Sequence, residues 1–322
     1  MNILLTGASG FIGGNLLPGL LADGHHVLAL GRRFKAKIVD EKVSYFEGDL
    51  TDLDHDDLLR GCCCEDLPEV FIHVAGQAHL AQTEQTKMLF EKNNIVVTET
   101  ALKLAARLTV KKFILLSSVS VLNDDEHDVY ASTKRAAEKK VLDFCHANGM
   151  DYVILRPVVV YGEADEKGNM LKLIRQLDQG IFPLFHHGQN IKDILYVQNL
   201  VAVICAIVQQ KQWDNQTLLL KDPQQVCLKD ICEKIVGKLG RKCWLIPIPG
   251  NVIPLLAWCL TLLQRIGFLR NYNVASVKRL GSDVDFGQEM RDDIKSLMPY
   301  STRQGLENTV QWYLKKRHEQ LA

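Results

Sequence analysis

Two side chains that could move a proton, Tyr130 and Lys134, stand four residues apart in the run YASTK. Residues at this spacing lie on the same face of a helix. An ammonium beside a phenol favours the phenolate, so we expect Lys134 to lower the pKa of Tyr130 from about 10. Tyr130 is then a candidate acid or base for a hydroxyl or carbonyl oxygen. The same pair also arises by chance on solvated helices. Other motifs in the chain are therefore needed to distinguish a catalytic pair from a chance one.

Two further polar side chains could serve the same oxygen. Ser118 follows the apolar run Phe113–Leu116, a predicted buried strand, and its hydroxyl could hydrogen-bond that oxygen at the strand end. Asn94 lies on a predicted helix from about Phe90 to Leu108 and could orient a water or the lysine in a proton relay. The predicted catalytic residues are Ser118, Tyr130, Lys134 and Asn94.

Three glycines near the N-terminus, Gly7, Gly10 and Gly13, stand where a dinucleotide would bind. They follow the apolar run Ile3–Leu5, a predicted strand, and the predicted helix Phe11–Ala22 begins among them. Glycines permit a tight turn and let the backbone approach a pyrophosphate, and the helix N-terminus supplies free N–H groups. The spacing is GxxGxxG rather than GxGxxG, and a turn without a ligand is the alternative.

The residues after the second predicted strand, His26–Leu30, bear on the choice of cofactor. A fold that prefers NAD places an acidic residue there, which binds the ribose 2′-hydroxyl. This chain has Arg32 and Arg33 instead, and two guanidiniums without a carboxylate suit a 2′-phosphate. We therefore predict NADP(H) as the preferred cofactor, with NAD(H) as the alternative. Both arginines could also be solvated surface residues.

Strand-like and helix-like segments alternate along the first part of the chain. This alternation predicts an α/β fold, a Rossmann-type doubly wound parallel sheet with a smaller C-terminal substrate-binding domain. Asp49 follows the predicted strand Val43–Phe46 and could bind the adenine amino group or cap a helix near Leu53. Further elements are predicted at Val70–Val74, Val153–Leu155, Leu195–Gln209 and Thr217–Leu220, the third of them a helix. The predicted NAD(P)-binding domain is 1–161 plus 194–220, and the substrate-binding domain is 162–193 and 221–322.

Composition narrows the class of protein. The chain has 322 residues, 47% of them hydrophobic, and 38 Lys and Arg balance 38 Asp and Glu, which gives no sign of a nucleic-acid partner. The nine cysteines lack the CxxC spacing of a zinc site, so we predict free thiols in a reducing cytosol and no metal. The N-terminus has no charged region before an apolar stretch, so no signal peptide is predicted. We expect a cytoplasmic protein.

One apolar stretch, Val252–Leu263, is membrane-like in composition. It is too short to span a bilayer, it contains Pro254, and Gln264 and Arg265 follow it at once. We predict that it is packed in the fold or at an interface, and contact with a membrane surface is the alternative. No transmembrane segment is predicted.

These motifs, in this order, resemble the extended short-chain dehydrogenase/reductase family, in its nucleotide-sugar epimerase, dehydratase and reductase group. The runs that carry the resemblance are TGASGFIG (Thr6–Gly13), GDLTD (Gly48–Asp52), HVAG (His73–Gly76), NIVVT (Asn94–Thr98), SSVSV (Ser117–Val121), YASTK (Tyr130–Lys134) and RPVVVYG (Arg156–Gly162). They span the first half of the chain. The second half is less similar, and its run GNMLKLIRQLDQG (Gly168–Gly180) looks most like bacterial reductases and epimerases acting at C4 of UDP-N-acetylhexosamines.

The resemblance implies which residues bind the cofactor and the substrate. The expected cofactor-binding residues are Gly7, Ser9, Gly10, Phe11, Ile12, Gly13, Arg32, Arg33, Asp49, Leu50, Val74, Ala75, Gly76, Tyr130, Lys134 and Pro157. The expected substrate-binding residues are Ser118, Asn169 and Lys192, the last two at a diphosphate or uridine. A helix cap and a surface lysine are the alternatives for Asn169 and Lys192. The short loop between Ser118 and Tyr130 and the pair Gln198–Asn199, in place of the family's usual aspartate, bear on substrate identity.

Three functions fit these residues. The first is an NAD(P)H-dependent reductase of a nucleotide-activated 4-keto-sugar, with UDP as the expected carrier, in which Tyr130 protonates the keto oxygen as hydride arrives. The second is a 4-epimerase that keeps NAD bound, and the third is a non-catalytic dinucleotide sensor. Arg32 and Arg33 favour the first, and the presence of Tyr130 and Lys134 argues against the third. The expected partners are a nucleotide-sugar substrate and, in a homodimer, a second copy of the chain.

Overall fold

The structure is a computed structural model of the chain. It describes residues 1–52, 67–78, 83–123, 125, 127–252, 286–287 and 290–321. These residues form two compact units. The first unit comprises Met1–Val160, Val197–Lys221 and Met290–Pro299, and the second comprises Tyr161–Tyr196, Asp222–Glu289 and Tyr300–Ala322. Met290–Pro299 clusters with the first unit, whereas the predicted boundaries placed it in the second.

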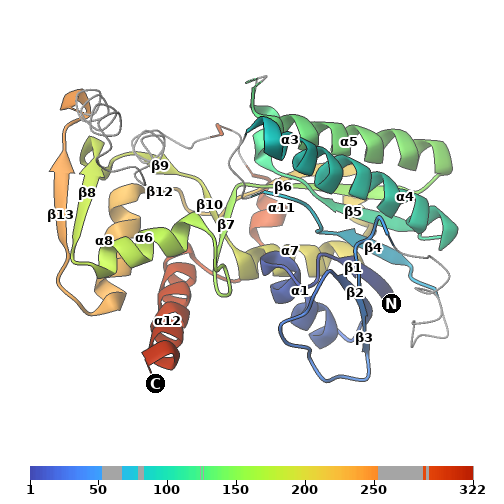
Figure 1. The fold of residues 1–322 in the computed structure, drawn as a ribbon, viewed down its shortest axis with the longest axis horizontal. Coiled ribbons are helices and arrows are strands. Elements are labelled where there is room, and N and C mark those ends of the chain that lie inside the picture. The colour runs from blue at the N-terminus through green and yellow to red at the C-terminus, as the bar shows by residue number, and fades with distance from the viewer. Residues whose placement is uncertain are drawn as a thin grey trace. The chain divides into compact units, whose positions relative to one another are not determined.

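A seven-stranded parallel sheet forms the centre of the first unit, with strand order β11-β6-β5-β4-β1-β2-β3 (Figure 1). The strands are β1 (Asn2–Thr6), β2 (His26–Gly31), β3 (Val43–Glu47), β4 (Val70–His73), β5 (Lys112–Leu116), β6 (Asp151–Pro157) and β11 (Gln216–Leu220). The central strands read as apolar runs because helices cover both faces of a parallel sheet. The predicted doubly wound α/β fold is confirmed.

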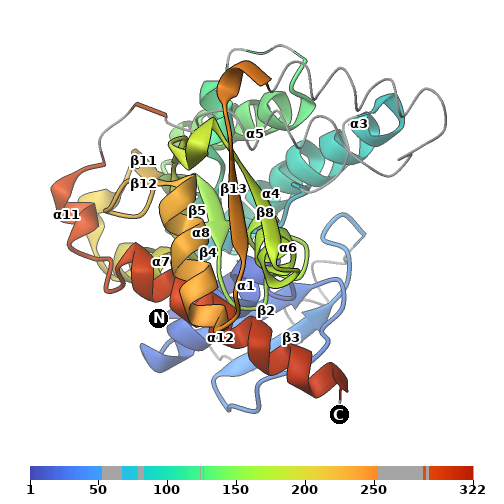
Figure 2. The ribbon, with the colours of Figure 1, turned by 90° about the vertical axis from the view of Figure 1, so that its left-hand side faces the viewer.

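Helices cover the two faces of this sheet, α1 and α7 on one and α3, α4 and α5 on the other (Figures 1 and 2). Their bounds are α1 (Phe11–Ala22), α3 (Glu84–Phe90), α4 (Val97–Arg107), α5 (Val129–Asn148) and α7 (Val197–Gln209). A π-helical turn, η1 (Glu91–Val96), joins α3 to α4. Further helical segments that the structure describes in this unit are the 3₁₀ turns η2 (Val119–Leu122) and η4 (Lys211–Trp213) and the short α11 (Asp292–Lys295).

The core between the sheet and helices α4 and α5 holds the first unit together. Phe71 of β4 and Phe113 of β5 are fully buried, and their rings stack with centroids 5.1 Å apart. Ala101 and Ala105 of α4 and Val141 of α5 belong to the same buried cluster. This packing fixes α5 on the sheet, and α5 carries Tyr130 and Lys134.

The strand order reverses between β1 and β4. In open α/β sheets ligands bind at the carboxyl ends of the strands, at such a point of reversal. β1 runs into the glycine turn and β4 runs into Val74–Gly76, so both loops open at this edge. β5 runs into Ser117 and Ser118 at the same edge.

The described residues of the second unit form three longer helices and several short strands. The helices are α6 (Asn169–Asp178), α8 (Leu228–Leu239) and α12 (Thr302–Leu321), and α8 contacts the other two (Figure 2). β8 (Ile181–Phe185) pairs in parallel with β13 (Trp244–Ile248), and β9 (Ile191–Lys192) pairs antiparallel with β12 (Val226–Cys227). Its other described elements are β10 (Ile194–Tyr196), η3 (His186–Gly188) and η5 (Gly250–Val252), and the boundary between the two units falls within β7 (Val159–Tyr161).

One predicted helix starts later in the structure, and two predicted features lie outside the described residues. The helix predicted from Leu195 begins at Val197, because Ile194–Tyr196 form β10. The predicted apolar stretch lies outside the described residues after Val252, as does the helix start near Leu53. Among the helices that the structure describes, none is long and apolar enough to cross a membrane.

Candidate active site

The turn after β1 requires glycine at two positions. Gly7 has a φ of 71°, and a Cβ there would lie 2.7 Å from the backbone nitrogen of Ala75. A Cβ on Gly13 would collide with the carbonyl oxygen of Gly7, so glycine lets α1 approach the turn closely. The turn is closed by Gly10, whose N–H donates to the carbonyl of Gly7 at 2.9 Å.

The N-terminus of α1 faces this turn and is suited to an anion. No side chain caps it, and its first turn contains no acidic residue. The first N–H groups of a helix lack intrahelical partners, and the helix dipole favours negative charge there. The tight glycine turn and the uncapped helix therefore fit the pyrophosphate of a dinucleotide. We call Gly7–Gly13 the dinucleotide cradle.

The end of β2 lies beside the dinucleotide cradle. A Cβ on Gly31 would lie 2.6 Å from Oγ of Ser9, so the serine of the glycine turn packs against this strand end. Arg32 and Arg33 follow, and both side chains are exposed. The structure thus brings the two predicted arginines to the end of β2, where the cofactor ribose is recognised in this kind of fold.

Asp49 follows β3 at the same edge. Its Oδ1 accepts hydrogen bonds from the backbone N–H of Thr51 at 3.1 Å and from the Thr51 hydroxyl at 2.9 Å. Burial raises the pKa of Asp49, but the Thr51 hydrogen bonds and the charges of Lys92 and Arg32 outweigh burial, and the net pKa is lowered. Asp49 is therefore an ionised acceptor that stabilises its own turn.

The other predicted cofactor residues lie on loops or element ends at this edge of the sheet. They are Phe11 and Ile12 in the first turn of α1, Leu50 after β3, Val74, Ala75 and Gly76 after β4, and Pro157 at the end of β6. The side chain of Leu50 is buried in the core.

Tyr130 stands in the first turn of α5. The helix begins at the N-cap Asp128, whose carboxylate accepts from the N–H of Ala131 at 3.0 Å. The ring of Tyr130 lies 6.2 Å from that of Phe90, centroid to centroid. Burial raises the pKa of Tyr130, a hydrogen bond with Ser118 lowers it, and the charge of Asp128 raises it again, so the net pKa lies above its ordinary value.

Ser118 and Tyr130 are thus brought together, as predicted. Ser118 is the N-cap of η2, and its Oγ accepts from the N–H of Ser120 at 3.2 Å and lies 3.0 Å from the Ser120 hydroxyl. These contacts fix the Ser118 hydroxyl at the end of β5. Tyr130 and Ser118 together present two hydroxyl groups that one substrate oxygen could contact.

Lys134 lies one turn further along α5 and is 6% exposed. Its Nζ donates to the carbonyl of Leu116, the last residue of β5, at 2.9 Å. Burial lowers the pKa of Lys134 to about 8, although the charge of Glu138 raises it. The expectation that Lys134 lowers the pKa of Tyr130 is wrong for this structure, because the lysine is directed at the strand and burial dominates the phenol.

Glu138, one further turn along, anchors the same face of α5. It is 4% exposed, and its carboxylate accepts from Nε and Nη2 of Arg156 at 3.0 and 2.6 Å. The hydroxyl of Ser117 donates to the same carboxylate at 2.5 Å. A buried charge is tolerable only with such partners. Glu138 therefore ties α5 to the sheet and keeps a negative charge near Lys134.

Asn94 sits in the π-helical turn η1 and is 1% exposed. Its Oδ1 accepts from the N–H of Gln77 at 2.8 Å, and its Nδ2 donates to the Gln77 carbonyl at 3.2 Å and to Oγ1 of Thr133 at 3.0 Å. A Cβ on Gly76 would lie 3.1 Å from Oδ1 of Asn94 and 3.2 Å from Nζ of Lys134. Asn94 therefore positions the loop after β4 beside Lys134, and its role in a proton relay stays a prediction.

A buried histidine links this region to β1. Nδ1 of His73 lies 2.8 Å from Oγ1 of Thr6, and Nε2 lies 3.2 Å from Oγ1 of Thr98. Thr98 donates its own proton to the carbonyl of Asn94 at 2.7 Å, so it must accept from His73, which assigns the proton to Nε2. Burial and then the charge of Lys134 lower the pKa of His73 to about 3, so the ring stays neutral.

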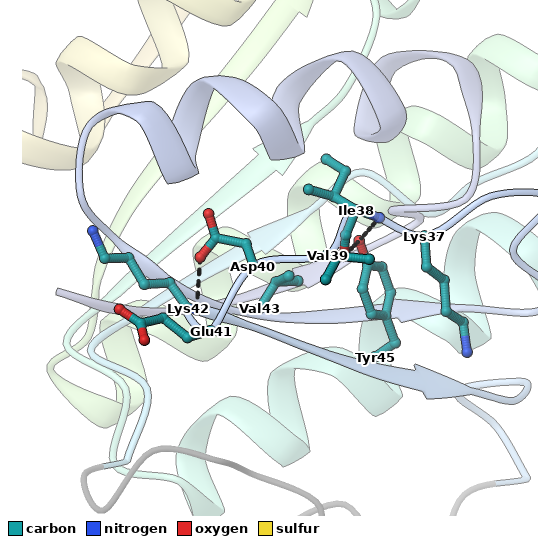
Figure 3. Close-up of a pocket in the computed structure, with 8 residues that line it drawn as sticks. All are labelled: Lys37, Ile38, Val39, Asp40, Glu41, Lys42, Val43 and Tyr45. Carbon is teal, nitrogen blue, oxygen red and sulfur yellow. Dashed lines mark hydrogen bonds between the residues drawn. The ribbon is translucent and has the colours of Figure 1, made fainter.

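A surface depression of the first unit contains none of these groups (Figure 3). It lies at the loop between β2 and β3 and is lined by Lys37, Ile38, Val39, Asp40, Glu41, Lys42, Val43 and Tyr45. The N–H of Lys42 donates to Asp40 at 2.8 Å, and the N–H of Ile38 donates to the Tyr45 hydroxyl at 2.7 Å. We therefore place the candidate active site at the carboxyl edge of the sheet and not in this depression.

The two predicted substrate residues of the second unit occupy a helix start and a short strand. Asn169 is the first residue of α6 and is exposed, and Lys192 lies on β9 and is half-buried. Both belong to the second unit, and their contact with a substrate stays a prediction.

Comparison with known proteins identifies the family. A model of the NAD dependent epimerase/dehydratase family matches residues 3–218. The chain belongs to this family. It is therefore an enzyme of the extended short-chain dehydrogenase/reductase type, as the resemblance predicted, and the dinucleotide cradle lies within the matched part.

Individual relatives of this epimerase/dehydratase match along most of their length. The UDP-glucose 4-epimerase of Vibrio cholerae is 26% identical over 82% of this chain and 82% of its own. The N-acetyl-α-D-glucosaminyl-diphospho-ditrans,octacis-undecaprenol 4-epimerase of Escherichia coli O157:H7 is 26% identical over 97% of this chain and 95% of its own. The structure of the UDP-glucuronic acid 4-epimerase of Bacillus cereus in complex with NAD has a TM-score of 0.73, at 19% identity, over 98% of this chain and 99% of that one, and shares the fold.

Two residues of this site, Glu138 and His73, were not among the predicted site residues. Glu138 had a usable signal, because Tyr130, Lys134 and Glu138 follow one another at intervals of four and so share a helix face. His73 stood in a quoted motif, but no local pattern shows that its ring nitrogens contact threonines from β1 and α4.

Proposed function

We propose that the protein is a 4-epimerase of a hexose carried on a diphosphate, and that it keeps NAD(H) bound. The observation that carries the proposal is the pairing of Tyr130 with Ser118 on the edge of the sheet that also holds the dinucleotide cradle. Relatives named as 4-epimerases cover most of the chain, and their names supply the diphosphate-linked hexose as the substrate class.

The chain's own residues would move the proton and orient the sugar. A bound nicotinamide supplies the acceptor and donor of hydride. After losing its own proton to solvent, the Tyr130 phenolate would take the proton of the 4-hydroxyl during oxidation and return it to the 4-keto oxygen during reduction, so that the phenolate is restored at the end of each cycle. Ser118 would hold that oxygen by a hydrogen bond, and Lys134, one turn further along α5, would contact the bound cofactor.

A reductase is the second candidate, and a specific observation favours it. Arg32 and Arg33 are exposed at the end of β2, and the chain carries no carboxylate between them and Lys35. Such a cluster suits the 2′-phosphate of NADPH. A reductase needs a protonated acid, and the raised pKa of Tyr130 suits that role. Net reduction would then consume one NADPH for each keto-sugar.

Product analysis separates the two candidates. Purified protein is incubated with UDP-glucose, UDP-N-acetylglucosamine and their 4-keto derivatives, with and without added NADPH. The proposal expects 4-epimers from the UDP-sugars without added reductant. Formation of alcohols only from the 4-keto compounds, with equal consumption of NADPH, would contradict it and establish the reductase.

The double change of Arg32 and Arg33 to alanine tests the cofactor. If the arginines bind a 2′-phosphate, affinity for NADPH falls far more than affinity for NADH. Equal losses for the two cofactors would remove the argument for NADPH. The cytoplasmic location and the homodimer stay predictions.

A further inference from the structure

The small sheet formed by β8 and β13 presents an apolar surface to solvent. Ile181, Trp244 and Ile246 are 62%, 74% and 49% exposed. By contrast, Trp213 of the first unit is only 1% exposed, and tryptophan side chains are on average highly buried in folded domains. Two five-residue strands thus carry three large apolar side chains that the described part of the chain leaves in water.

The strand register gathers these side chains on one side. Trp244 pairs with Ile181 in the parallel ladder, and Ile246, two residues further on, points to the same side. Phe182, between the outward positions of β8, points the other way and is 2% exposed. We call the outward residues the β8–β13 face: Ile181, Pro183, Trp244 and Ile246.

Basic residues adjoin the β8–β13 face. Arg241 and Lys242 precede β13 in the chain, and both are exposed. Arg241 also forms an ion pair with Asp178, with 3.7 Å between the guanidinium nitrogen and the carboxylate oxygen. In sequence, the chain then continues into the uncharged run Val252–Leu263, which Gln264 and Arg265 follow. Tryptophan and aliphatic residues bordered by cations are typical of surfaces that lie at the headgroups of a bilayer.

The size of the β8–β13 face argues against a second copy of the chain as its partner. Two paired strands of this length present a surface of about 17 Å by about 10 Å. This is roughly 170 Å², well below the roughly 800 Å² that each partner contributes to a stable protein interface. A lipid surface needs no matching pocket, and anionic headgroups complement Arg241 and Lys242.

We propose that the β8–β13 face binds the surface of an anionic bilayer. Trp244 and Ile246 enter the headgroup region, and Arg241 and Lys242 contact lipid phosphates. Attachment is peripheral and reversible, and it weakens as salt screens the basic residues. The proposal does not depend on which reaction the first unit catalyses.

Vesicle sedimentation with the full-length protein tests this proposal. The vesicles are phosphatidylglycerol with phosphatidylethanolamine, and phosphatidylcholine alone as the neutral comparison. The variant is W244T with I246T, because threonine keeps a β-branched side chain in β13. The control is V39T, because Val39 is 101% exposed and lies in the first unit. Circular dichroism and cofactor binding check that each variant folds.

The proposal expects the wild type and V39T to sediment with anionic vesicles, and the double variant to bind at least about tenfold more weakly. Equal binding of the double variant and the wild type, or no binding of the wild type to anionic vesicles, would overturn it. A loss of self-association in the double variant, measured by sedimentation velocity without lipid, would also overturn it and assign the face to a second copy. Turnover of water-soluble UDP-sugars is expected to be unchanged in the double variant.

Discussion

The buried polar groups beside α5 and the apolar β8–β13 face depart from ordinary burial in opposite directions. His73, Asn94, Lys134 and Glu138 are polar and are between 0% and 6% exposed. Each has partners within the chain, on strands or helices of the first unit. Trp244 and Ile246 are apolar and are 74% and 49% exposed, with no comparable cover from the described residues.

The polar groups beside α5 have their hydrogen-bond partners within the chain, whereas the described residues leave the β8–β13 face to be covered by another molecule. Burying a polar group without a hydrogen bond is costly, so the network of the first unit holds its members in one arrangement before any ligand arrives. An exposed apolar face has the opposite need, because its unfavourable contact with water ends only when something outside the chain covers it. The first region is preorganised for chemistry, and the second is available for association.

Loss of the Tyr130 hydroxyl is the largest expected effect on the catalytic side of this comparison. Tyr130→Phe should lower turnover by about 100-fold or more, since positioned proton transfer contributes roughly 10² to 10⁴. Ser118→Ala should cost less, because Ser118 only orients the oxygen. Cofactor affinity should survive both changes, since the pyrophosphate is held at the dinucleotide cradle.

Tyr313→Phe is the matched control, because that hydroxyl bonds Asp178 in the second unit at 2.9 Å. Steady-state turnover and cofactor titration are measured for all three variants, with circular dichroism for folding. A folded Tyr130→Phe protein with near-normal turnover would place the acid or base elsewhere.

A methyl group in the dinucleotide cradle is expected to have the next largest effect. In Gly13→Ala the new Cβ meets the carbonyl of Gly7, so α1 must move away from the turn. Cofactor affinity should fall about tenfold or more, because misplaced helix N–H groups no longer meet the pyrophosphate. Gly14→Ala is the control, since its nearest contact would be an ordinary 3.7 Å from the carbonyl of Ala8. Equal affinities of the two variants in calorimetric titration would contradict this account of the cradle.

The hydrogen bond between His73 and Thr98 can be removed without changing Tyr130 or the dinucleotide cradle. Thr98→Val removes the acceptor of the His73 Nε2 proton and should lower the free energy of unfolding by about 1 to 2 kcal/mol. Thr100→Val is matched to it, because Thr100 also donates to a carbonyl four residues earlier, but that hydrogen bond is exposed to solvent. The control should change by less than about 0.5 kcal/mol. Urea titrations that give the same loss for both variants would show that the buried link does not stabilise this region.

The smallest effect is expected from pH. Lys134 has a pKa near 8, below its ordinary value, so its ammonium is present below that pH and is lost above it. Cofactor affinity should therefore fall severalfold as the pH rises from about 7 to about 9. Glu138→Gln removes the charge that raises this pKa and should move the midpoint to lower pH, whereas Glu99→Gln, on the surface pair with Lys140, should not. A cofactor affinity that does not change across this pH range would show that the charge of Lys134 does not contribute to cofactor binding.

Much of the first unit could be predicted because its signals are local. The apolar run Ile3–Leu5, the glycine triplet and the spacing of Tyr130 and Lys134 each report the conformation of a few consecutive residues. Once parallel strands are assumed, their carboxyl ends must share an edge, so Ser118 and Gly76 fall near one another without further information. The match to the epimerase/dehydratase family over residues 3–218 then confirms the predicted family and its fold.

The remaining features depend on contacts between distant segments. The bidentate pair of Arg156 with Glu138 decides how α5 sits on the sheet, and neither residue reveals the other in sequence. The pKa of Lys134 follows from burial, which residue types alone do not report. Paired residues of β8 and β13, such as Ile181 and Trp244, lie 63 positions apart in the sequence, and no alternation of apolar and polar residues marks the side that stays exposed.

One isotopic measurement tests the proposed reaction most directly. UDP-glucose and UDP-N-acetylglucosamine, each with deuterium at C4, are incubated with the purified protein without added cofactor. A 4-epimerase that returns the same hydride keeps the deuterium at C4 of the epimer, and this is the predicted result. No epimer from either deuterated sugar, together with NADPH-dependent reduction of the 4-keto UDP-sugars, would contradict the account and identify a reductase.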